Sequence, residues 1–298
     1  MPIRRIRIST AGDQVDVLGE SPVWCPRDEA IYWIDWATNV LRRLRSRDGT
    51  LAEWRMKEKV GSFALCQRGG AILAMQSGFH LFDFDSTDTT FIADPNPAGI
   101  RHGLNDGKCD RAGRFWAGSI VAPLAELTGD SEPGFLFCLD ADLRSRKAYD
   151  GMLICNGIAW SPDARTIYFG DSGRRVIFRG AFDLDDGVIH EVSVFSSIEG
   201  SATPDGSTVD TDGCLWNARY GAGQLVRYDP SGRIVETIPL PVTHPTSCIF
   251  GSENLDQLYV TTSRWRLSEK ELAEQPLAGR LLVLDVGRTG LPETQFAG

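Results

Sequence analysis

Residues 20–35 read ESPVWCPRDEAIYWID, a turn-forming group that leads into a strand rich in aromatic and aliphatic residues. The same phrase returns five more times, at residues 64–78, 105–119, 156–172, 207–221 and 247–263. One marker from each copy stands 40 to 53 residues from the next: Trp33, Leu73, Trp116, Phe169, Trp216 and Tyr259. A period in this range is typical of β-propeller blades, in which each repeat forms one four-stranded sheet. We therefore expect an all-β, six-bladed β-propeller that takes up residues 1–298 as a single domain.

The rest of the chain fits this expectation. Short runs rich in β-branched and aromatic residues alternate with Asp-Gly, Pro-Asp and Ser-Gly turns, a pattern that predicts strands. The runs are Ala30–Asp35, Ala71–Met75, His80–Asp85, Arg114–Ile120, Gly134–Asp140, Thr166–Gly170, Val176–Ala181, Cys214–Ala218, Gln224–Asp229, Gln257–Thr262 and Arg280–Val286. One segment breaks the β pattern: Ser268 and Glu271 have the spacing of a capping box, which predicts one short helix that ends near Gln275, before Pro276.

The composition narrows the classes of function. The formal net charge of −9 disfavours binding to a phosphate backbone, so we expect no nucleic-acid partner. No apolar run approaches the roughly 18 residues of a membrane span, and the N-terminus lacks the apolar stretch of a secretory signal. The seven cysteines are odd in number and lack CxxC spacing, which indicates reduced and mostly buried thiols. We expect a cytoplasmic protein without a membrane partner, either a monomer or a weak homo-oligomer.

Four polar residues stand close to the first strand of four different repeats. They are Glu20, Asn105, Asn156 and Asp205. Propellers place functional groups around one mouth of the central channel, so the ring should bring these four side chains together. Each residue alone reads as part of a common turn sequence, such as Asn-Gly or Pro-Asp-Gly. Their recurrence at one register of the ring favours a shared site.

The four side chains offer only oxygen ligands, from two carboxylates and two amides. Such a set suits a hard divalent cation such as Ca²⁺, Mg²⁺ or Mn²⁺. Coordination positions that protein groups leave free are what a Lewis-acid catalyst needs. The histidines, His80, His102, His190 and His244, lack the spacing of a zinc site. The chain also lacks a Gly-x-Ser-x-Gly elbow, a GxGxxG motif after a strand and a P-loop, so serine hydrolases of the α/β class and nucleotide cofactors are not supported.

These phrases resemble the gluconolactonase/regucalcin (senescence marker protein) family over about Leu18 to Leu291. The similar phrases are Gly19–Trp24, Asn105–Lys108, Gly113–Gly118, Asn156–Asp163 and Pro204–Gly206. The stretch Leu267–Leu277, with Ala278 and Gly279, looks like the bacterial sugar-lactonase branch. The resemblance implies a six-bladed propeller with one divalent cation near the channel mouth, which could be Ca²⁺, Mg²⁺, Mn²⁺, Zn²⁺ or Fe²⁺. It assigns Glu20, Asn156 and Asp205 as metal ligands, Asn105 as a substrate contact and Asp205 also as the catalytic acid/base.

The chain departs from the family pattern at two places. Many members carry an arginine two residues before the asparagine of the Asn-Asp-Gly phrase, where this chain has Gly103. Arg101 or His102, just upstream, is the expected replacement as a substrate-binding residue. An acidic substrate-binding residue of some members would fall near Pro123, where no acid stands.

The function expected from the resemblance is hydrolysis of a sugar lactone to its aldonic acid. The cation would polarise the lactone carbonyl, and either Asp205 or a metal-bound hydroxide would start the attack by water. Two alternatives remain open at this point. One is a non-enzymatic, calcium-binding or scaffold propeller. The other is an aryl-ester or organophosphate hydrolase on the same fold.

Overall fold

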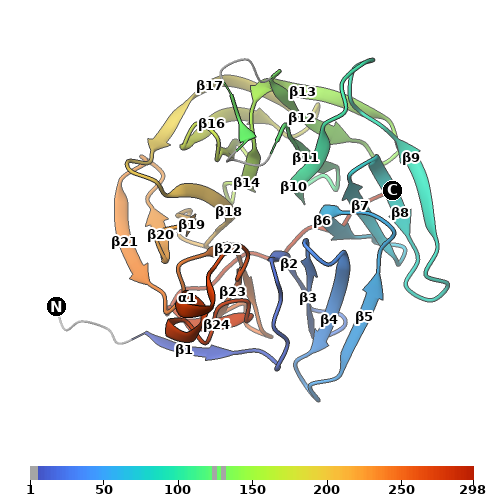
Figure 1. Cartoon of the computed structure of the whole chain (residues 1–298). Coiled ribbons are helices and arrows are strands. Elements are labelled where there is room, and N and C mark those ends of the chain that lie inside the picture. The colour runs from blue at the N-terminus through green and yellow to red at the C-terminus, as the bar shows by residue number, and fades with distance from the viewer. Residues whose placement is uncertain (1–5, 123–125, 129–131) are drawn as a thin grey trace.

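The computed structural model describes residues 6–122, 126–128 and 132–298. Six four-stranded antiparallel sheets stand around a common centre, each with one strand edge toward the axis (Figure 1). This arrangement confirms the predicted six-bladed β-propeller. The position named near Pro123 lies outside the described residues.

The strands fall into four concentric sets. The innermost strands are β2 (Gly19–Cys25), β6 (Val60–Leu65), β10 (Gly103–Cys109), β14 (Cys155–Trp160), β18 (Thr203–Val209) and β22 (Pro245–Gly251). The second strands are β3 (Ala30–Asp35), β7 (Ala71–Met75), β11 (Phe115–Ile120), β15 (Thr166–Asp171), β19 (Leu215–Tyr220) and β23 (Gln257–Thr262). The third strands are β4 (Val40–Arg45), β8 (Gly78–Phe82), β12 (Gly134–Leu139), β16 (Val176–Asp183), β20 (Gln224–Tyr228) and β24 (Leu282–Asp285). The outer strands are β1 (Arg7–Thr10), β5 (Leu51–Arg55), β9 (Thr89–Ala93), β13 (Ser145–Met152), β17 (Val188–Ser197) and β21 (Ile234–Pro239).

We number the blades one to six in the order of their innermost strands, β2 to β22. Each innermost strand contacts the innermost strand of the next blade, and β22 contacts β2, so the ring is closed. The repeat marker stands on the second strand of each blade, not on the first as the sequence suggested. The innermost strands escaped prediction because their Asn-Gly and Pro-Asp-Gly sequences resemble turns.

Blade six is built from both ends of the chain. Its three inner strands come from β22 to β24, and its outer strand is β1, which pairs antiparallel with β24 from Arg7 opposite Asp285 to Thr10 opposite Leu282. The N-terminal strand therefore closes the ring. The sequence did not predict β1, because it lies outside the repeated phrase.

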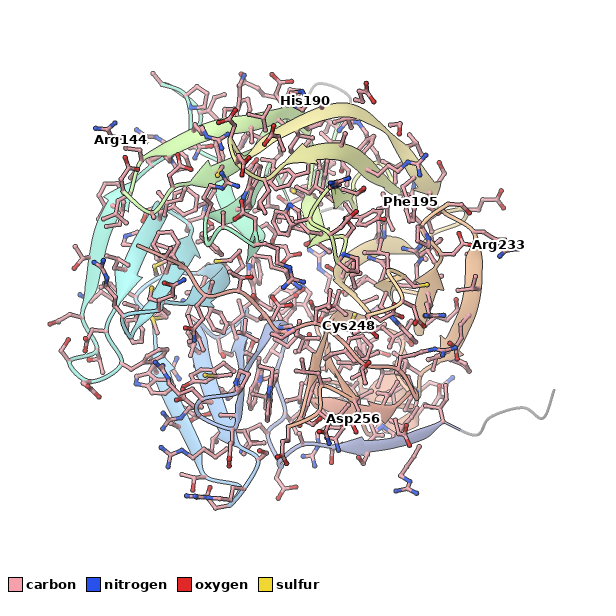
Figure 2. All side chains as sticks on the ribbon, turned by 180° about the vertical axis from the view of Figure 1, so that it is seen from behind. Arg144, His190, Phe195, Arg233, Cys248 and Asp256 are labelled. Atoms are coloured by element: carbon pink, nitrogen blue, oxygen red, sulfur yellow. The ribbon has the colours of Figure 1, made fainter. Side chains whose placement is uncertain are left out.

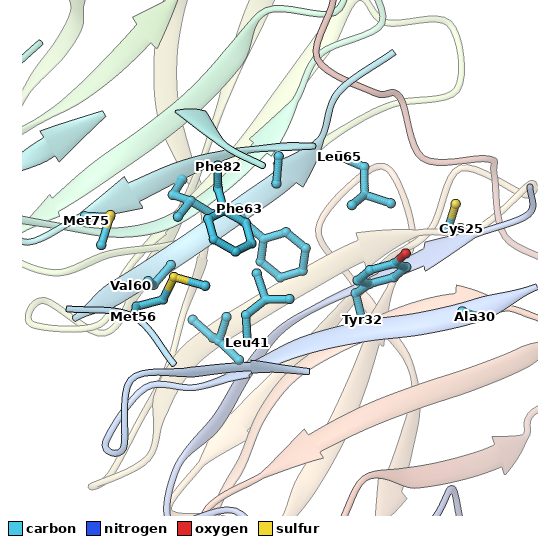
Figure 3. Close-up of a cluster of buried hydrophobic side chains, with 13 residues drawn as sticks. Cys25, Ala30, Tyr32, Leu41, Met56, Val60, Phe63, Leu65, Met75 and Phe82 are labelled. Atoms are coloured by element: carbon cyan, nitrogen blue, oxygen red, sulfur yellow. The ribbon is translucent and has the colours of Figure 1, made fainter. Parts of the chain in front are cut away.

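The apolar core lies between blades. Alternate residues of each strand face the two neighbouring blades, so that every interface between adjacent blades contains one cluster of buried side chains. Figure 3 shows the cluster between blades one and two, where Tyr32 and Leu41 face Phe63 and Phe82. Each large aromatic ring buried in this way stabilises the fold by about 1.5–3 kcal/mol, so the blades are held together mainly by apolar burial.

The chain ends as a strap across the face of the ring opposite α1. We call residues 289–297 the C-terminal strap. Thr211 N–H donates to Thr289 O at 2.9 Å on blade five, and Phe296 N–H donates to Leu65 O at 2.9 Å on blade two. The C-terminus consequently lies beside β7 and β8, across the ring from β24 (Figure 1). Phe296 is fully buried in the cluster between blades two and three.

Polar side chains lie on the rim of the ring, whereas the cysteines are buried inside it. From behind, Arg144, His190 and Arg233 lie on the rim of the ring, whereas Cys248 on β22 lies near its centre (Figure 2). All seven cysteines are free and buried, as predicted. Within the described residues, no helix is long and apolar enough to cross a membrane.

The predicted helix is α1 (Glu269–Glu274), between β23 and β24. Ser268 caps it and forms the predicted capping box with Glu271, while Gln275 is the C-cap residue. This helix lies over blade six in Figure 1, where it borders the cavity described next.

Candidate functional site

Each innermost strand carries a β-bulge, one extra residue relative to its neighbour in the blade. The six register shifts lie between Glu20 and Val23, Val60 and Ser62, Leu104 and Gly107, Asn156 and Ala159, Pro204 and Ser207, and Pro245 and Ser247. Bulges re-aim side chains and are common beside active sites. The four candidate residues of the sequence stand at these bulges. They therefore lie within the innermost strands, not in turns before them.

Two of the four residues stand one position further along the bulge than the others. Glu20 and Asn156 are the last paired residues before it, whereas Asn105 and Asp205 follow the last paired residue. After Glu20 and Asn156 the backbone turns left-handed, with φ 49° at Ser21 and 62° at Gly157. This local turn explains how residues at different offsets reach one place.

Gly157 is needed at its position for a second reason. A Cβ atom there would lie 2.7 Å from the carbonyl oxygen of Asp205 and 2.7 Å from Ser207 Oγ. Both distances are shorter than any ordinary carbon–oxygen contact, so a side chain would push blades four and five apart. The close approach holds the bulge of blade four against the bulge of blade five.

Glu20, Asn105, Asn156 and Asp205 all line one cavity of about 570 Å³. A cavity of this size holds a small organic molecule. Asn156 is 8% exposed and Asp205 7% exposed, so both are largely buried although they line the cavity. The cavity is also lined by Leu18, Trp36, Ile120, Ile154, Ser172, Thr203, Tyr220, Thr243, His244, Trp265, Arg266, Leu267 and Glu271.

The two amides are fixed by hydrogen bonds. Asn105 Nδ2 donates to Asn156 Oδ1 at 2.9 Å and to the carbonyl oxygen of Cys155 at 2.9 Å. Asn156 Nδ2 donates to Ser172 Oγ at 2.8 Å, and that hydroxyl donates to Pro204 O at 2.6 Å. With both NH₂ groups directed at protein acceptors, Asn105 Oδ1 is left to serve the cavity, whereas Asn156 Oδ1 already accepts from Asn105 and offers only its second lone pair.

Asp106 holds the bulges of blades three and four together beneath the cavity. Its carboxylate accepts hydrogen bonds from Gly157 N–H at 2.7 Å and from Gly107 N–H at 2.9 Å. Lys108, two residues on, donates to Ser207 O at 3.1 Å and lies 3.5 Å from Glu293 of the C-terminal strap. The chain Asp106–Lys108–Glu293 therefore links the floor of the site to the strap. Sequence analysis did not single out these residues, although Asp106 and Lys108 belong to the quoted Asn-Asp-Gly-Lys phrase.

The carboxylates of Glu20 and Asp205, at the floor of the cavity, and the carboxylate of Asp106 repel one another. Burial, followed by the negative charge of Asp106, raises the pKa of Glu20 to about 8. Burial, followed by the charges of Glu20 and Asp106, raises the pKa of Asp205 well above its usual range. Of the groups that the structure describes, no Lys, Arg or His acts on either carboxylate to lower its pKa. Two crowded acids without a cationic partner are unfavourable unless they share protons or bind a cation.

A divalent cation fits this donor set. Glu20 and Asp205 would supply negative charge, and Asn156 Oδ1 a neutral oxygen, which is the chemistry that hard cations prefer. No three His, Cys, Asp or Glu side chains gather as a metal site in residues 6–122, 126–128 and 132–298. A cation here would therefore depend on an amide oxygen as well as on the two carboxylates.

Arg101 and His102 stand apart from the other candidates. Arg101 has a side chain that is 87% exposed and lies 3.5 Å from Asp94. His102 has a buried Nε2 atom without a hydrogen-bond partner, and neither residue lines the cavity. A Cβ atom on Gly103 would lie 2.9 Å from the side-chain amide of Gln76, which takes up the space that a larger residue would need. The substrate-binding role of Arg101 and His102 stays a prediction.

Comparison with known proteins identifies the family. Residues 18–264 match the family model described as SMP-30/Gluconolactonase/LRE-like region. The chain belongs to this family. It is 37% identical to a 6-deoxy-6-sulfogluconolactonase of Pseudomonas putida, over 96% of this chain and 97% of that protein. It is 34% identical to an L-arabinolactonase of Azospirillum brasilense, over 96% and 94% of the two chains.

Its fold is also similar to the solved structure of a calcium-binding protein of Agrobacterium tumefaciens named regucalcin. The TM-score is 0.89, with 24% identity over 97% of each chain. The family assigned from the sequence phrases is thus confirmed, and the family includes proteins named as sugar lactonases.

We expect the stability of the cation-free protein to fall as pH rises toward 8. The raised pKa of Glu20, about 8 against an ordinary 4.5, means that the folded state keeps a proton that the unfolded chain releases above about pH 4.5. The stability linked to that proton is present below pH 4.5 and is lost as pH rises through 8. Thermal unfolding from pH 5 to 9 in chelator should show the decline. Saturating Ca²⁺ or Mg²⁺ should raise the melting temperature by several degrees at pH 8.

Glu20→Gln is the matched variant for this experiment. It removes the ionisable group but keeps the shape, so the pH slope between 5 and 8 and the response to added cation should both shrink. An unchanged slope and an unchanged response in Glu20→Gln would show that this carboxylate is not the titrating, cation-binding group.

Proposed function

We propose that this protein hydrolyses a sugar lactone to the corresponding aldonic acid in the cavity at the bulges. The observation that carries the proposal is that Glu20, Asn105, Asn156 and Asp205, from four blades, line one cavity large enough for such a molecule. Membership of a family with named sugar lactonases supports the same reaction class.

In the proposed reaction, water adds to the lactone carbonyl carbon and the bond from that carbon to the ring oxygen breaks. A divalent cation held by Glu20, Asn156 and Asp205 would polarise the carbonyl and stabilise the oxyanion. The Asp205 carboxylate accepts the proton of the attacking water and returns it to the ring oxygen as the ring opens. Since the proton goes back to the leaving oxygen, Asp205 is restored after each turnover.

The surrounding residues orient the substrate. Asn105 keeps its Oδ1 toward the cavity because its Nδ2 is bonded to Asn156 and Cys155, so Oδ1 can accept from a sugar hydroxyl. The apolar side chains Leu18, Ile120 and Ile154 exclude bulk water from one side of the cavity. We infer that the substrate is an aldonolactone, in keeping with the names of the two relatives.

A panel of esters tests this proposal. Hydrolysis is followed at constant pH, because each turnover releases one acid. We expect turnover of aldonolactones, loss of activity in chelator and recovery with a single divalent cation. Faster turnover of aryl esters or organophosphates would instead assign the alternative hydrolase. Calcium binding without hydrolysis of any ester would assign the non-enzymatic propeller.

A further inference from the structure

The cavity has two unlike sides. Leu18, Trp36, Ile120 and Ile154 line it from blades one, three and four. From blades five and six it is lined by Tyr220, Thr243 and His244 and by the loop Trp265–Leu267 between β23 and α1. Arg266 is the only Lys or Arg among the lining residues in the part of the chain that the structure describes.

The backbone of Arg266 is held in place although its side chain is exposed. Arg264 N–H donates to Val17 O at 3.0 Å, Trp265 N–H donates to Ser263 Oγ at 2.9 Å, and the capped helix α1 begins three residues later. Arg266 has φ 64°, a left-handed conformation that is uncommon for a residue with a long side chain. Such conformations persist where the surroundings enforce them, often at ligand-binding sites.

The guanidinium group of Arg266 has no acidic partner. Among residues 6–122, 126–128 and 132–298, no carboxylate lies within 4.0 Å of it. Glu271 of α1, the charged residue that also lines the cavity near Arg266, is turned to the helix cap, where its Oε2 accepts from Ser268 N–H at 2.8 Å and from Ser268 Oγ at 2.6 Å. Arg266 is thus a free cation at the rim of a cavity whose floor carries acids.

The stacked pair Tyr220 and His244 links this cation to the floor. Their rings lie 4.2 Å apart and are parallel within 1°. Burial and the charges of Asp205 and Glu20 raise the pKa of Tyr220 to about 12, whereas the charge of Arg266 acts to lower it. The Tyr220 phenol is therefore close enough to interact electrostatically with Arg266 at the rim and with Glu20 and Asp205 at the floor. Burial lowers the pKa of His244, against the opposing charge of Glu271, and so favours the uncharged ring.

We propose that Arg266 forms an anion-binding subsite, so that the preferred substrate is a lactone with an anionic substituent remote from its carbonyl. This inference rests on the proposed lactonase function, because that function places the carbonyl at Glu20, Asn156 and Asp205. The far end of the molecule then extends past Tyr220 to the rim. A planar guanidinium binds carboxylate, phosphate and sulfonate groups through paired, charge-assisted hydrogen bonds. A neutral sugar tail gains much less from it.

The experiment compares 6-phosphogluconolactone with the neutral gluconolactone, using wild type, Arg266→Asn and Arg264→Gln. Asparagine tolerates the left-handed backbone and removes the charge. Arg264 is two residues away on the same loop but does not line the cavity, so its variant controls for overall charge.

We expect Arg266→Asn to raise KM for the phosphorylated lactone by about ten- to a hundredfold, the usual effect of losing a charge-assisted hydrogen bond. Turnover of the neutral lactone should change less than about twofold, and Arg264→Gln should behave as wild type. The wild-type preference for the anionic lactone should weaken as salt is raised.

The outcomes separate this inference from the proposed function. Hydrolysis of both lactones with no anionic preference, or with equal effects of Arg266→Asn on both, overturns the anion subsite and leaves the lactonase standing. If neither lactone is hydrolysed, the proposed function fails. In that case binding of 6-phosphogluconate and gluconate is compared through the fluorescence of Trp36 and Trp265, which line the cavity. Equal affinity for the two acids, or affinity unaffected by Arg266→Asn, also overturns the anion subsite.

Discussion

Asp205→Asn should lower lactone hydrolysis by at least about a hundred- to ten-thousandfold, the range expected when a general acid/base is lost. Asp205 is 7% exposed at the cavity floor, and the asparagine that replaces it has the same shape but neither charge nor basicity. The variant should remain folded. The substitution removes a buried like-charge interaction with Glu20, so the melting temperature in chelator should be equal to or higher than that of wild type.

Two measurements make this prediction decisive. Initial rates with gluconolactone give the loss in kcat/KM, and thermal unfolding by circular dichroism shows that the fold is intact. Asp142→Asn, on an exposed hairpin of blade three, is the matched control and should keep full activity. Near-normal hydrolysis by Asp205→Asn would remove this residue from the chemistry.

The second large effect is on stability. Phe296→Ala should lower the free energy of unfolding by about 3–5 kcal/mol, as expected when a fully buried aromatic ring is removed and a cavity is left. Phe296 packs with Phe115, Phe137 and Leu139 between blades two and three. Its backbone also bonds to Leu65 and Gln67, at 2.9 Å each. The side chain thus anchors the C-terminal strap to the ring.

Urea unfolding followed by tryptophan fluorescence measures this change. Pro292→Ala, in the exposed part of the same strap, should cost less than about 1 kcal/mol, because it keeps the carbonyl that accepts from Arg111. Equal stabilities of Phe296→Ala and Pro292→Ala would mean that the strap contributes nothing to the core.

The fold was predictable because one feature of the sequence repeats at blade length. Marker residues such as Trp33 and Trp216 stand on buried second strands, where only large apolar residues fill the space between blades. Strand β1 could not be predicted in the same way. It pairs with β24, which lies at the other end of the chain, and nothing in Arg7–Thr10 repeats the phrase. Ring closure is a tertiary property that a local pattern does not encode.

The floor of the site was also predictable in part. Glu20, Asn105, Asn156 and Asp205 stand at bulges that recur in every blade, so a shared register places them together. The residues that line the walls of the cavity do not recur at one register of the blades. Tyr220 and His244 lie at the ends of strands, and Arg266 lies on the loop between β23 and α1, outside the repeated phrase. Their arrival at one cavity depends on loop geometry, which the spacing of residues in the sequence does not fix.

The C-terminal strap crosses the ring on the side of the floor that faces away from the cavity. The space that Asp106, Lys108 and Glu293 line there has a volume of about 20 Å³, too small for a sugar. An acid formed by ring opening would therefore have to depart by the route its precursor used. Accumulated product should consequently inhibit by competing with fresh substrate, and initial rates measured with added aldonate should show an increased KM at constant kcat.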